Sequence, residues 1–291
     1  MHSQVIVISG CSSGIGYAAA RFLKDRGHQV FVSARRYADL ENLQKEGFNA
    51  VLMDMDDTHS IANAIEQILL QTLGRLDVLI NNAGFGQGGA LEDITRDTLR
   101  EQFETNVFGL MDLTRHVIPV MRQQGSGRII NISSILGLVS MPFRGAYNAS
   151  KYAVEGLSDT LRLELKASGI KVITVNPGPI ESMFRRNVMS NSLKKVLIEE
   201  SHFAPRYQHM RQFFEEQKSQ SFFTCNTNVV NKKLRHAIES SHPKARYYVT
   251  FAAYALAFTK RLFSTKMLDR VLTRLSAKEL GHSATDTNKI N

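Results

Sequence analysis

Short runs of β-branched and other apolar residues recur along the chain, and longer stretches with helical periodicity separate them. The runs occupy residues 4–9, 29–34, 49–54, 76–81, 128–133, 170–176 and 246–251. They are continuous rather than alternating, which is typical of strands buried on both faces, as in a parallel sheet. Strand–helix alternation from residue 4 to residue 251 therefore predicts an α/β fold with a doubly wound parallel sheet flanked by helices.

One long segment departs from this alternation. Residues 183–225 are mixed in composition and helical in pattern, so they look like an insertion. We therefore expect a single domain over residues 1–291, with a core over about 1–251. A helical C-terminal extension over residues 252–280 and a frayed tail over residues 281–291 are expected to complete it.

Cysteine usage and the lengths of the apolar runs bear on the compartment. Cys11 and Cys225 are the two cysteines, too few for a disulfide framework in 291 residues. The apolar run at residues 5–9 is too short for the core of a signal peptide. The longest nearly apolar run, residues 247–258, falls well short of the ~20 residues that a membrane-spanning helix needs. We expect a cytoplasmic protein.

The formal charge of +9 is distributed unevenly. Residues 1–184 hold 17 Lys and Arg against 19 Asp and Glu, a net charge of −2, whereas residues 185–291 hold 19 against 8, a net charge of +11. No nucleic-acid-binding module accompanies the basic last third, so nucleic acid is not expected as a partner. An anionic membrane surface or an acidic group on a substrate stays open.

A glycine-rich turn, "SGCSSGIG", follows the first predicted strand and leads directly into an Ala-rich helix. Glycines let the backbone turn sharply and approach a pyrophosphate, and the helix N-terminus behind them supplies free N–H groups. The context predicts a dinucleotide site, although the spacing is GxxxGxG rather than the commoner GxGxxG. The expected contacts are Gly10, Ser12, Ser13, Gly14, Ile15 and Gly16.

The end of the second strand bears on the choice of cofactor. A fold that selects NAD usually carries an acid there, whereas this chain has Ala34, Arg35 and Arg36. Cations at this place would receive a 2′-phosphate, which favours NADP(H). Asp54, at the tip of the third strand, would either meet the adenine amino group or cap the following helix. No metal site is predicted.

Tyr147 precedes Lys151 by four residues in "YNASK", a stretch that is typical of a helix. At this spacing both side chains lie on one helical face. Tyr and Lys are common on surface faces, so the pair could be without function. The alternative is acid–base chemistry, in which a neighbouring ammonium group favours the phenolate and lowers a phenol pKa that is ordinarily about 10.

Four motifs in a fixed order decide between these readings: "SGCSSGIG" at 9–16, "NNAG" at 81–84, "NISS" at 131–134 and "YNASK" at 147–151. With them the chain resembles the short-chain dehydrogenase/reductase family. The resemblance implies a seven-stranded Rossmann-like sheet, a nicotinamide cofactor and homo-oligomers. By general appearance the chain is similar to the branch of retinol and 17β-hydroxysteroid dehydrogenases, which has bacterial members that act on aldehydes.

The resemblance also implies a catalytic tetrad formed by Asn106, Ser134, Tyr147 and Lys151. Ser134 is chosen over Ser133 because it stands thirteen residues before Tyr147, which matches the family spacing. Hydride transfer to a carbonyl leaves an alkoxide that needs a proton, which Tyr147 would donate. Lys151 would tune Tyr147 and hold the nicotinamide ribose, and Ser134 would position the substrate oxygen. Asn106 is expected to interrupt its helix and to relay protons through water.

Further cofactor contacts follow from the matched motifs. The residues expected beside the adenosine half are Asn82, Ala83 and Gly84. The segment "NPGPIES" resembles the one that embraces the nicotinamide amide, with Ser182 where the family usually has Thr. The expected contacts there are Pro177, Gly178, Ile180 and Ser182. Asn81 and Asp77 are expected to stabilise the sheet instead.

The substrate is expected to be lipophilic, because apolar residues follow the serine motif and begin the insertion: Leu136, Leu138, Val139, Met141, Phe143, Met183 and Phe184. An aldehyde, a retinoid or a steroid would fit, although the same residues could be ordinary core. A 3-oxoacyl carrier-protein or CoA reductase is the alternative enzyme. A non-catalytic NADP-binding regulatory protein is the alternative of another class, and it would not need Tyr147 and Lys151 together.

Two helical regions are expected to make contacts outside the subunit. In the family, the helices over residues 95–123 and 147–168 often pair across a two-fold axis, which implies a homodimer or homotetramer. The apolar residues assigned to that face are Tyr152, Leu157, Leu161 and Leu165.

The C-terminal segment shows an apolar face at helical spacing, formed by Phe258, Leu262, Leu268, Leu272 and Leu275. Basic residues surround it: Lys260, Arg261, Lys266, Arg270, Arg274 and Lys278. Such a helix could lie weakly on an anionic membrane. It could equally pack over the substrate cleft or on a second subunit, with its charges in water.

Overall fold

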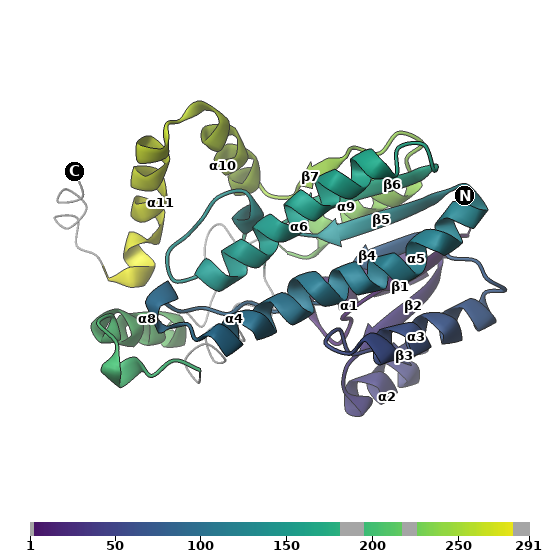
Figure 1. Ribbon diagram of the computed structural model, residues 1–291, viewed down its shortest axis with the longest axis horizontal. Coiled ribbons are helices and arrows are strands. Elements are labelled where there is room, and N and C mark those ends of the chain that lie inside the picture. Colours follow the sequence, from purple (N-terminus) through teal and green to yellow (C-terminus); the bar gives the residue numbers. More distant parts are fainter. Residues whose placement is uncertain (1–2, 181–194, 217–225, 282–291) are drawn as a thin grey trace.

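A single parallel sheet organises the chain. The computed structural model describes residues 3–180, 195–216 and 226–281, and within them seven strands pair in the order β3-β2-β1-β4-β5-β6-β7 (Figure 1). All six neighbouring pairs are parallel. The strands are β1 (Val5–Ile8), β2 (Gln29–Ala34), β3 (Asn49–Leu52), β4 (Val78–Asn81), β5 (Gly127–Ile132), β6 (Ile170–Asn176) and β7 (Arg246–Tyr248). The predicted doubly wound α/β fold is confirmed.

Helices cover both faces of the sheet. One face carries α1 (Gly14–Asp25), α2 (Tyr37–Lys45) and α9 (Asn228–Glu239), whose apolar residues share a core with β1, β2 and β4. The other face carries α3 (Thr58–Gln71), α5 (Leu110–Gln124) and α6 (Gly145–Glu164). The remaining helical elements are α4 (Arg96–Phe103), α8 (Ala204–Glu216), α10 (Phe251–Leu262), α11 (Thr265–Leu280), the π-helical η2 (Glu104–Gly109) and the 3₁₀ turns η1 (Leu91–Asp93), η3 (Ile135–Gly137) and η4 (Ile198–Glu200).

The core corrects part of the expected subunit face. Leu161, on α6, and Leu165, its C-cap residue, are 8% and 4% exposed and pack with α3 and α5 against the sheet. The prediction that they lie outward is therefore wrong. Helical spacing shows which residues share a face but not whether that face points outward. In the fold, Tyr152 and Leu163 are the large apolar residues of α6 that are exposed, at 37% and 68%.

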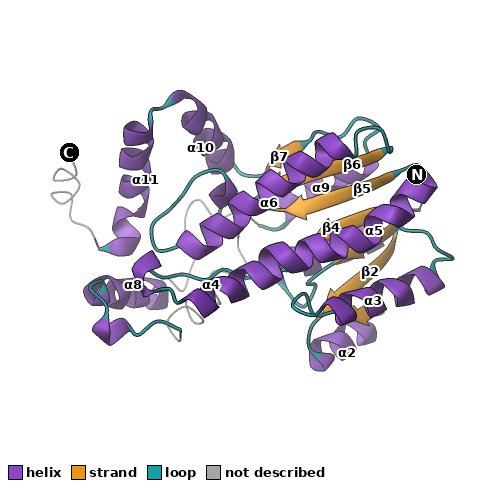
Figure 2. Cartoon of the chain, in the orientation of Figure 1, coloured by secondary structure: helices purple, strands orange, loops and turns teal. Residues whose placement is uncertain are grey.

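The strand order creates a crevice at one end of the sheet. The chain builds outward from β1 to β3 and then returns to place β4 on the other side of β1. In open α/β sheets, ligands bind outside the carboxyl ends of the strands at such a switch point. The strand arrows in Figure 2 point toward the side on which α8, α10 and α11 lie, so these helices border the ligand-binding end.

Buried polar side chains join the central strands to the helices behind them. The Asn81 amide donates to Thr114 Oγ1 at 2.9 Å and to Asn131 Oδ1 at 2.8 Å, and Asn131 donates onward to Ser158 Oγ at 2.8 Å. The Asp77 carboxylate accepts the backbone N–H of Val5 at 2.7 Å. Because buried polar groups cost free energy unless they are hydrogen-bonded, these pairs fix the strand register. The expected structural roles of Asn81 and Asp77 are confirmed.

The last strand is shorter than predicted, and the reason is local. Instead of continuing to residue 251, β7 ends at Tyr248. Thr250 is the N-cap residue of α10, and its hydroxyl accepts the backbone N–H of Ala253 at 3.2 Å. Thr is a favoured N-cap residue, so the helix begins where β-branched composition had predicted strand.

The described part of the predicted insertion packs against the ligand-binding end. Tyr207 of α8 donates its hydroxyl to Asp93 Oδ2 at 2.7 Å and accepts the backbone N–H of Ala90 at 2.8 Å. Its ring meets Phe143 edge-on at 5.4 Å between centroids. Thus α8 is anchored to the loop after β4 and to the loop before α6.

The C-terminal extension differs from its prediction. It forms two helices, because the chain turns at Phe263 and Ser264 instead of continuing as one amphipathic helix. The predicted single apolar face is therefore wrong. Leu268 and Leu272 pack on Ile135 and Val139, whereas the other predicted members, Phe258, Leu262 and Leu275, are exposed. Across the described ranges, no helix is long and apolar enough to cross a membrane.

Candidate active site

The predicted tetrad comes together at the carboxyl ends of β4 and β5. Tyr147 and Lys151 lie one turn apart near the start of α6, Ser134 follows β5, and Asn106 lies in η2. Tyr147 is half-buried, whereas the other members are 9% exposed or less. The side chains of Tyr147 and Ser134 share a hydrogen bond. Ser134 and Lys151 thus lie beside Tyr147, and Asn106 is joined to the same helix through Ser150.

Lys151 is a buried cation held by a main-chain carbonyl. Its Nζ donates to the carbonyl oxygen of Ile132, the last residue of β5, at 2.8 Å, and lies 5.8 Å from the centre of the Tyr147 ring. Burial lowers the pKa of Lys151 to about 8, and the negative charge of Glu155 opposes that shift. The ammonium form therefore predominates at neutral pH but is lost in mildly alkaline solution.

The expectation that Lys151 lowers the pKa of Tyr147 is wrong for the chain's own groups. Burial raises the pKa of Tyr147 to about 12, and the hydrogen bond with Ser134 only partly offsets it. The Lys151 ammonium group is engaged with Ile132 instead. Tyr147 consequently keeps its proton at neutral pH, which is the form that a proton donor needs.

The two adjacent serines have different surroundings. Ser134 is the N-cap residue of η3, and its Oγ accepts the backbone N–H of Leu136 at 3.1 Å and shares a hydrogen bond with Tyr147. Ser133 is 3% exposed, and its Oγ has no hydrogen-bond partner among the described residues. The geometry favours Ser134 as the serine beside the phenol, in line with the choice made from spacing.

Asn106 interrupts its helix as expected. The helical path from α4 to α5 passes through the π-helical η2, a geometry that is frequent at functional sites. Asn106 is fully buried, so it is not a plain surface residue. Its Oδ1 accepts the N–H of Phe85 at 3.0 Å, and its Nδ2 donates to the Phe85 carbonyl at 2.9 Å and to Ser150 Oγ at 3.1 Å. The amide therefore clamps the loop after β4 onto α6.

A buried polar network behind the tetrad escaped the sequence reasoning. Glu155 is 6% exposed; it accepts Asn176 Nδ2 at 2.5 Å and Arg246 Nη2 at 2.6 Å. Asn176 Nδ2 also donates to the Ser134 carbonyl at 3.1 Å. The available signal was the position of Glu155, one helical turn after Lys151. Its partners on β6 and β7 had no such signal, because only the fold brings them near.

The glycine turn lies against the end of β4. Gly10 has φ of +71°, and a Cβ there would come within 2.7 Å of Ala83 Cα, so only glycine fits. The Asn82 side chain donates to the carbonyls of Ser9 and Gly10 at 3.0 and 2.8 Å. Asn82 and Ala83 therefore support the turn from below. The other predicted members of the turn are Ser12 and Ser13, which are exposed, Gly14 and Ile15, which are half-buried, and Gly16, which is buried.

The two arginines after β2 have different partners. Arg36 makes a two-point ion pair with Asp39, with Nε–Oδ2 at 2.7 Å and Nη2–Oδ1 at 3.0 Å. Arg35 is exposed and makes no hydrogen bond or ion pair with any residue that the structure describes. Asp54 accepts the N–H of Asp56, whereas Asp57 caps α3 by accepting the N–H of His59. Asp54 is thus not the cap of that helix.

The segment after β6 is held in place by the site around it. The Pro177 carbonyl accepts the N–H of Ile135 at 2.9 Å, Gly178 lies against the Thr250 side chain, and Ile180 is buried in the core. Gly84 approaches Asn106, since a Cβ on it would come within 2.8 Å of Asn106 Oδ1. Ser182 lies outside the described residues, as do Met183 and Phe184.

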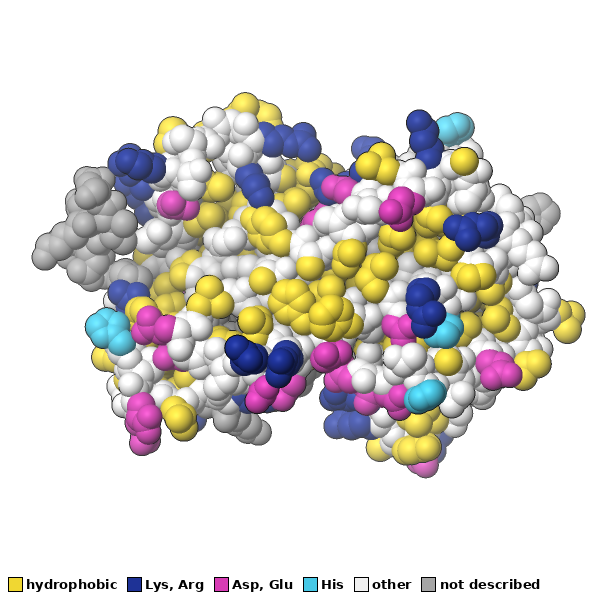
Figure 3. Space-filling view, viewed as in Figure 1, with side chains coloured by type: hydrophobic (Ala, Val, Ile, Leu, Met, Phe, Trp, Pro, Cys, Tyr) yellow, Lys and Arg dark blue, Asp and Glu magenta, His cyan; other side chains and the backbone are white. Residues whose placement is uncertain are grey.

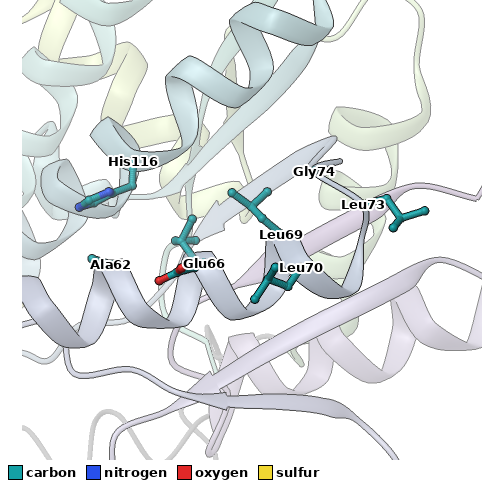
Figure 4. A pocket seen from close by; sticks show the side chains of 8 residues that line it. Ala62, Glu66, Leu69, Leu70, Leu73, Gly74 and His116 are labelled. Carbon is teal, nitrogen blue, oxygen red and sulfur yellow. The ribbon is translucent and has the colours of Figure 1, made fainter.

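Most of the predicted substrate-pocket residues serve as packing. Val139 is buried with α10 and α11, and Phe143 is buried with α8. Leu136, Leu138 and Met141 are partly buried at the edge of the same cluster. A surface hollow of about 570 Å³ lies elsewhere, between α3 and His116 of α5, and Figure 4 shows the leucines Leu69, Leu70 and Leu73 around it. It adjoins the C-terminal end of α3, away from Tyr147, and has no part in this site.

Comparison with known proteins shows which family has this arrangement of motifs. The family model of the short chain dehydrogenases matches residues 4–192. The uncharacterized oxidoreductase YbbO of Escherichia coli K12 is 40% identical over 267 residues, covering 92% of this chain and 93% of YbbO. Bovine 17-beta-hydroxysteroid dehydrogenase type 6 is 31% identical, covering 94% of this chain and 89% of that enzyme. The resemblance to steroid-type relatives is thereby confirmed.

A solved structure agrees with the fold. A single-site variant of the actinorhodin polyketide ketoreductase, crystallised with NADPH, superposes with a TM-score of 0.69 at 28% identity, covering 86% of this chain and 97% of that one. The parallel sheet, the glycine turn and the matched family model agree with one another. The chain belongs to the short-chain dehydrogenase/reductase family of oxidoreductases.

Proposed function

We propose that the protein transfers hydride between NADP(H) and the carbonyl or alcohol group of a lipophilic substrate. The observation that carries this proposal is the convergence of Ser134, Tyr147 and Lys151, with a protonated phenol held between a hydroxyl and a buried cation. A regulatory protein without turnover would have no use for a buried lysine beside a phenol. The tetrad therefore favours an enzyme over the non-catalytic alternative.

The residues present fit a dinucleotide. At Gly10 a side chain would collide with Ala83, so glycine lets the turn pack closely against the end of β4. The first turn of α1 presents its N–H groups beside this turn, and Ser13, its N-cap residue, makes no side-chain cap hydrogen bond. Free N–H groups at a helix N-terminus favour phosphate. When bound, the cofactor supplies the hydride.

Arg35 supports the choice of NADP(H). Because Arg36 is committed to Asp39, Arg35 is the cation of the pair that remains available to a 2′-phosphate. Asp54, half-buried at the tip of β3, would face the adenine side. The further contacts proposed are Asn82, Ala83, Gly84, Pro177, Gly178, Ile180 and Ser182. The NADPH-bound ketoreductase is consistent with this preference.

The chain's own groups suffice to position and protonate a carbonyl substrate. Ser134 would donate to the substrate oxygen and hold it beside the Tyr147 hydroxyl. Tyr147 would give its proton to that oxygen as negative charge develops on it. Lys151, whose Nζ is held by the Ile132 carbonyl, would hold the nicotinamide ribose. Asn106, by holding the Phe85 loop to α6, keeps that site in place.

The substrate class rests on the apolar edge of the site. Leu136, Leu138 and Met141 are partly buried in the segment that follows Ser134, and a hydrocarbon group could cover them. The steroid-acting relative also has a lipophilic substrate. A 3-oxoacyl thioester is the second candidate, since the basic last third of the chain suits an acidic carrier.

One screen separates these candidates. NADPH oxidation would be followed with long-chain aldehydes, ketosteroids and 3-oxoacyl thioesters, with Tyr147→Phe as the blank for each. We expect the highest kcat/KM on an aldehyde or ketosteroid. A preference for the thioester would replace the substrate class, and turnover that persists in the blank would overturn the catalytic assignment itself.

The assembly proposed is a homodimer or homotetramer, the usual state in this family. Large apolar side chains are exposed on the two helical regions concerned: Leu99, Phe108, Tyr152 and Leu163. Figure 3 shows hydrophobic side chains gathered along the middle of the face that α5 and α6 present. We further propose that residues 1–291 act as one domain. The cytoplasmic location stays a prediction.

A further inference from the structure

The outward face of α10 breaks the usual separation of apolar core and polar surface. Phe251, Tyr254, Phe258 and Leu262 recur at spacings of three and four residues, which places them on one helical face. Their relative exposures are 85%, 47%, 64% and 64%. Single exposed apolar side chains are ordinary, whereas an aligned group of large ones marks an interaction surface. These four residues are called the α10 stripe.

The stripe faces outward because the opposite face of α10 is already packed. Ala253 and Ala257 are 0% and 7% exposed and share a cluster with Ile135 and Val139. The N-cap hydroxyl of Thr250 fixes where the helix begins. No rotation of α10 could bury the stripe without exposing this second apolar face.

The surroundings of the stripe are basic. Residues 251–280 hold six Lys and Arg against Asp269 and Glu279, and Glu279 is paired with Arg144. Arg261 neighbours the stripe on the helix and is exposed, as is Lys266 just beyond its end. Lys233 lies over the Tyr254 ring at 5.8 Å. In Figure 3, dark-blue and yellow side chains share the surface over α10 and α11.

This combination decides between two kinds of partner. A second copy that met the same surface across a two-fold axis would bring like charges together. Six Lys and Arg of residues 251–280 face only two acids in the same range, Asp269 and Glu279, and Glu279 already pairs with Arg144. Anionic lipid headgroups complement these cations, and the interfacial region accepts aromatic and Leu side chains. We propose that α10 docks the protein onto an anionic membrane surface, with the stripe in the interface and Arg261 and Lys266 against the headgroups.

Docking through α10 would bring the membrane next to the site. The buried face of α10 packs on η3, which begins directly after Ser134. Its N-cap residue Thr250 lies against Gly178. The proposal does not depend on the catalytic assignment, because lipid binding is measured without substrate.

Vesicle co-sedimentation tests the proposal. Full-length protein should pellet with phosphatidylcholine vesicles that contain phosphatidylglycerol, and less so without phosphatidylglycerol or at high salt. The double variant Phe258→Ser/Leu262→Ser should bind at least ~10-fold more weakly, because two apolar side chains no longer enter the interface. The matched control is Leu70→Ser/Leu73→Ser, which removes two exposed leucines of 75% and 97% exposure from another surface and should bind like the parent.

A fluorescent reporter identifies the surface that inserts. The chain contains no Trp, so Phe258→Trp and Leu73→Trp each report from one place. With anionic vesicles, the emission of Phe258→Trp should shift to shorter wavelength and that of Leu73→Trp should not. Equal shifts for both, or equal binding by both double variants, would overturn the proposal. So would a shift of Phe258→Trp that follows protein concentration without lipid, since that marks a second copy as the partner.

Discussion

Two helices at the ligand-binding end break the ordinary rule of burial in opposite directions. On α6 a cation is inside, since Lys151 is 5% exposed; on α10 an aromatic ring is outside, since Phe251 is 85% exposed. The chain itself stabilises the buried cation, through a hydrogen bond to the Ile132 carbonyl and the negative charge of Glu155. In the α10 stripe, Tyr254 meets Lys233 and Tyr248, whereas the other three side chains stay largely exposed. The difference teaches that the buried cation of α6 is satisfied within the subunit, whereas the α10 stripe is the surface for which we propose a partner from outside.

The largest expected effect would break the α6 side of this comparison. Tyr147→Phe removes the hydroxyl and keeps the ring, so folding and cofactor binding should persist. General acids contribute about 10²–10⁴-fold, and kcat on the best substrate should fall by that order. Vesicle binding of this variant should stay at the parental level. Near-parental turnover would show that the phenol is not the proton donor.

Cofactor affinity should separate the two arginines after β2. Arg35→Ala should weaken NADPH binding by about 10- to 150-fold, the cost of losing one charge-assisted contact, and should leave NADH binding nearly unchanged. Arg36→Ala is the matched control, because its guanidinium is held by Asp39. Isothermal titration measures both. Equal losses for NADPH and NADH in Arg35→Ala would rule out a 2′-phosphate contact.

The surface proposed to contact a second subunit is also apolar and exposed, so it can be compared with α10. Phe108 is 55% exposed on η2, and Phe108→Asp should weaken self-association by about tenfold or more by placing a charge in an apolar interface. Light scattering over a dilution series would show a shift toward monomer. Phe258→Asp on α10 is the control and should leave the subunit state unchanged. The opposite result would exchange the roles of the two surfaces.

A smaller effect concerns pH. As pH rises through about 8, Lys151 loses its proton, so kcat should fall on the alkaline side. The negative charge of Glu155 raises the pKa of Lys151; Glu155→Gln should therefore move this fall to lower pH, by less than about one unit. Pre-steady-state or kcat profiles from pH 6 to 10 would show the shift. An unchanged pH profile of kcat would mean that Glu155 only holds Asn176 and Arg246 in place.

The smallest effect is on stability. The pKa of Lys151 is below its ordinary 10.5 in the folded chain, so the unfolded state binds more protons between about pH 8 and 10.5, and stability should rise with pH in that window. Lys151→Met lacks this contribution. The difference in free energy of unfolding between the two should shift in favour of the wild type over that window. A constant difference would mean that folding does not lower the pKa of Lys151.

Local pattern carried much of the fold. The strand segments 29–34 and 170–176 have the predicted bounds, because continuous apolar runs between turn residues leave few alternatives. Where strand and cap signals competed, as at Thr250, the cap decided. The pairing of Tyr147 with Lys151 also followed from spacing, since residues four positions apart on a helix lie on the same face.

The sequence by itself determined the strand and helix segments, the glycine turn and the positions of the phenol and the ammonium group, because each depends on neighbours within a few residues. Tertiary structure alone decided that burial raises the pKa of Tyr147 and that Leu161 faces the core. It also decided that Arg246 meets Glu155, a residue 91 positions away in the chain. The physical reason is the same in each case: solvent exposure and long-range contacts arise only when separate elements pack together.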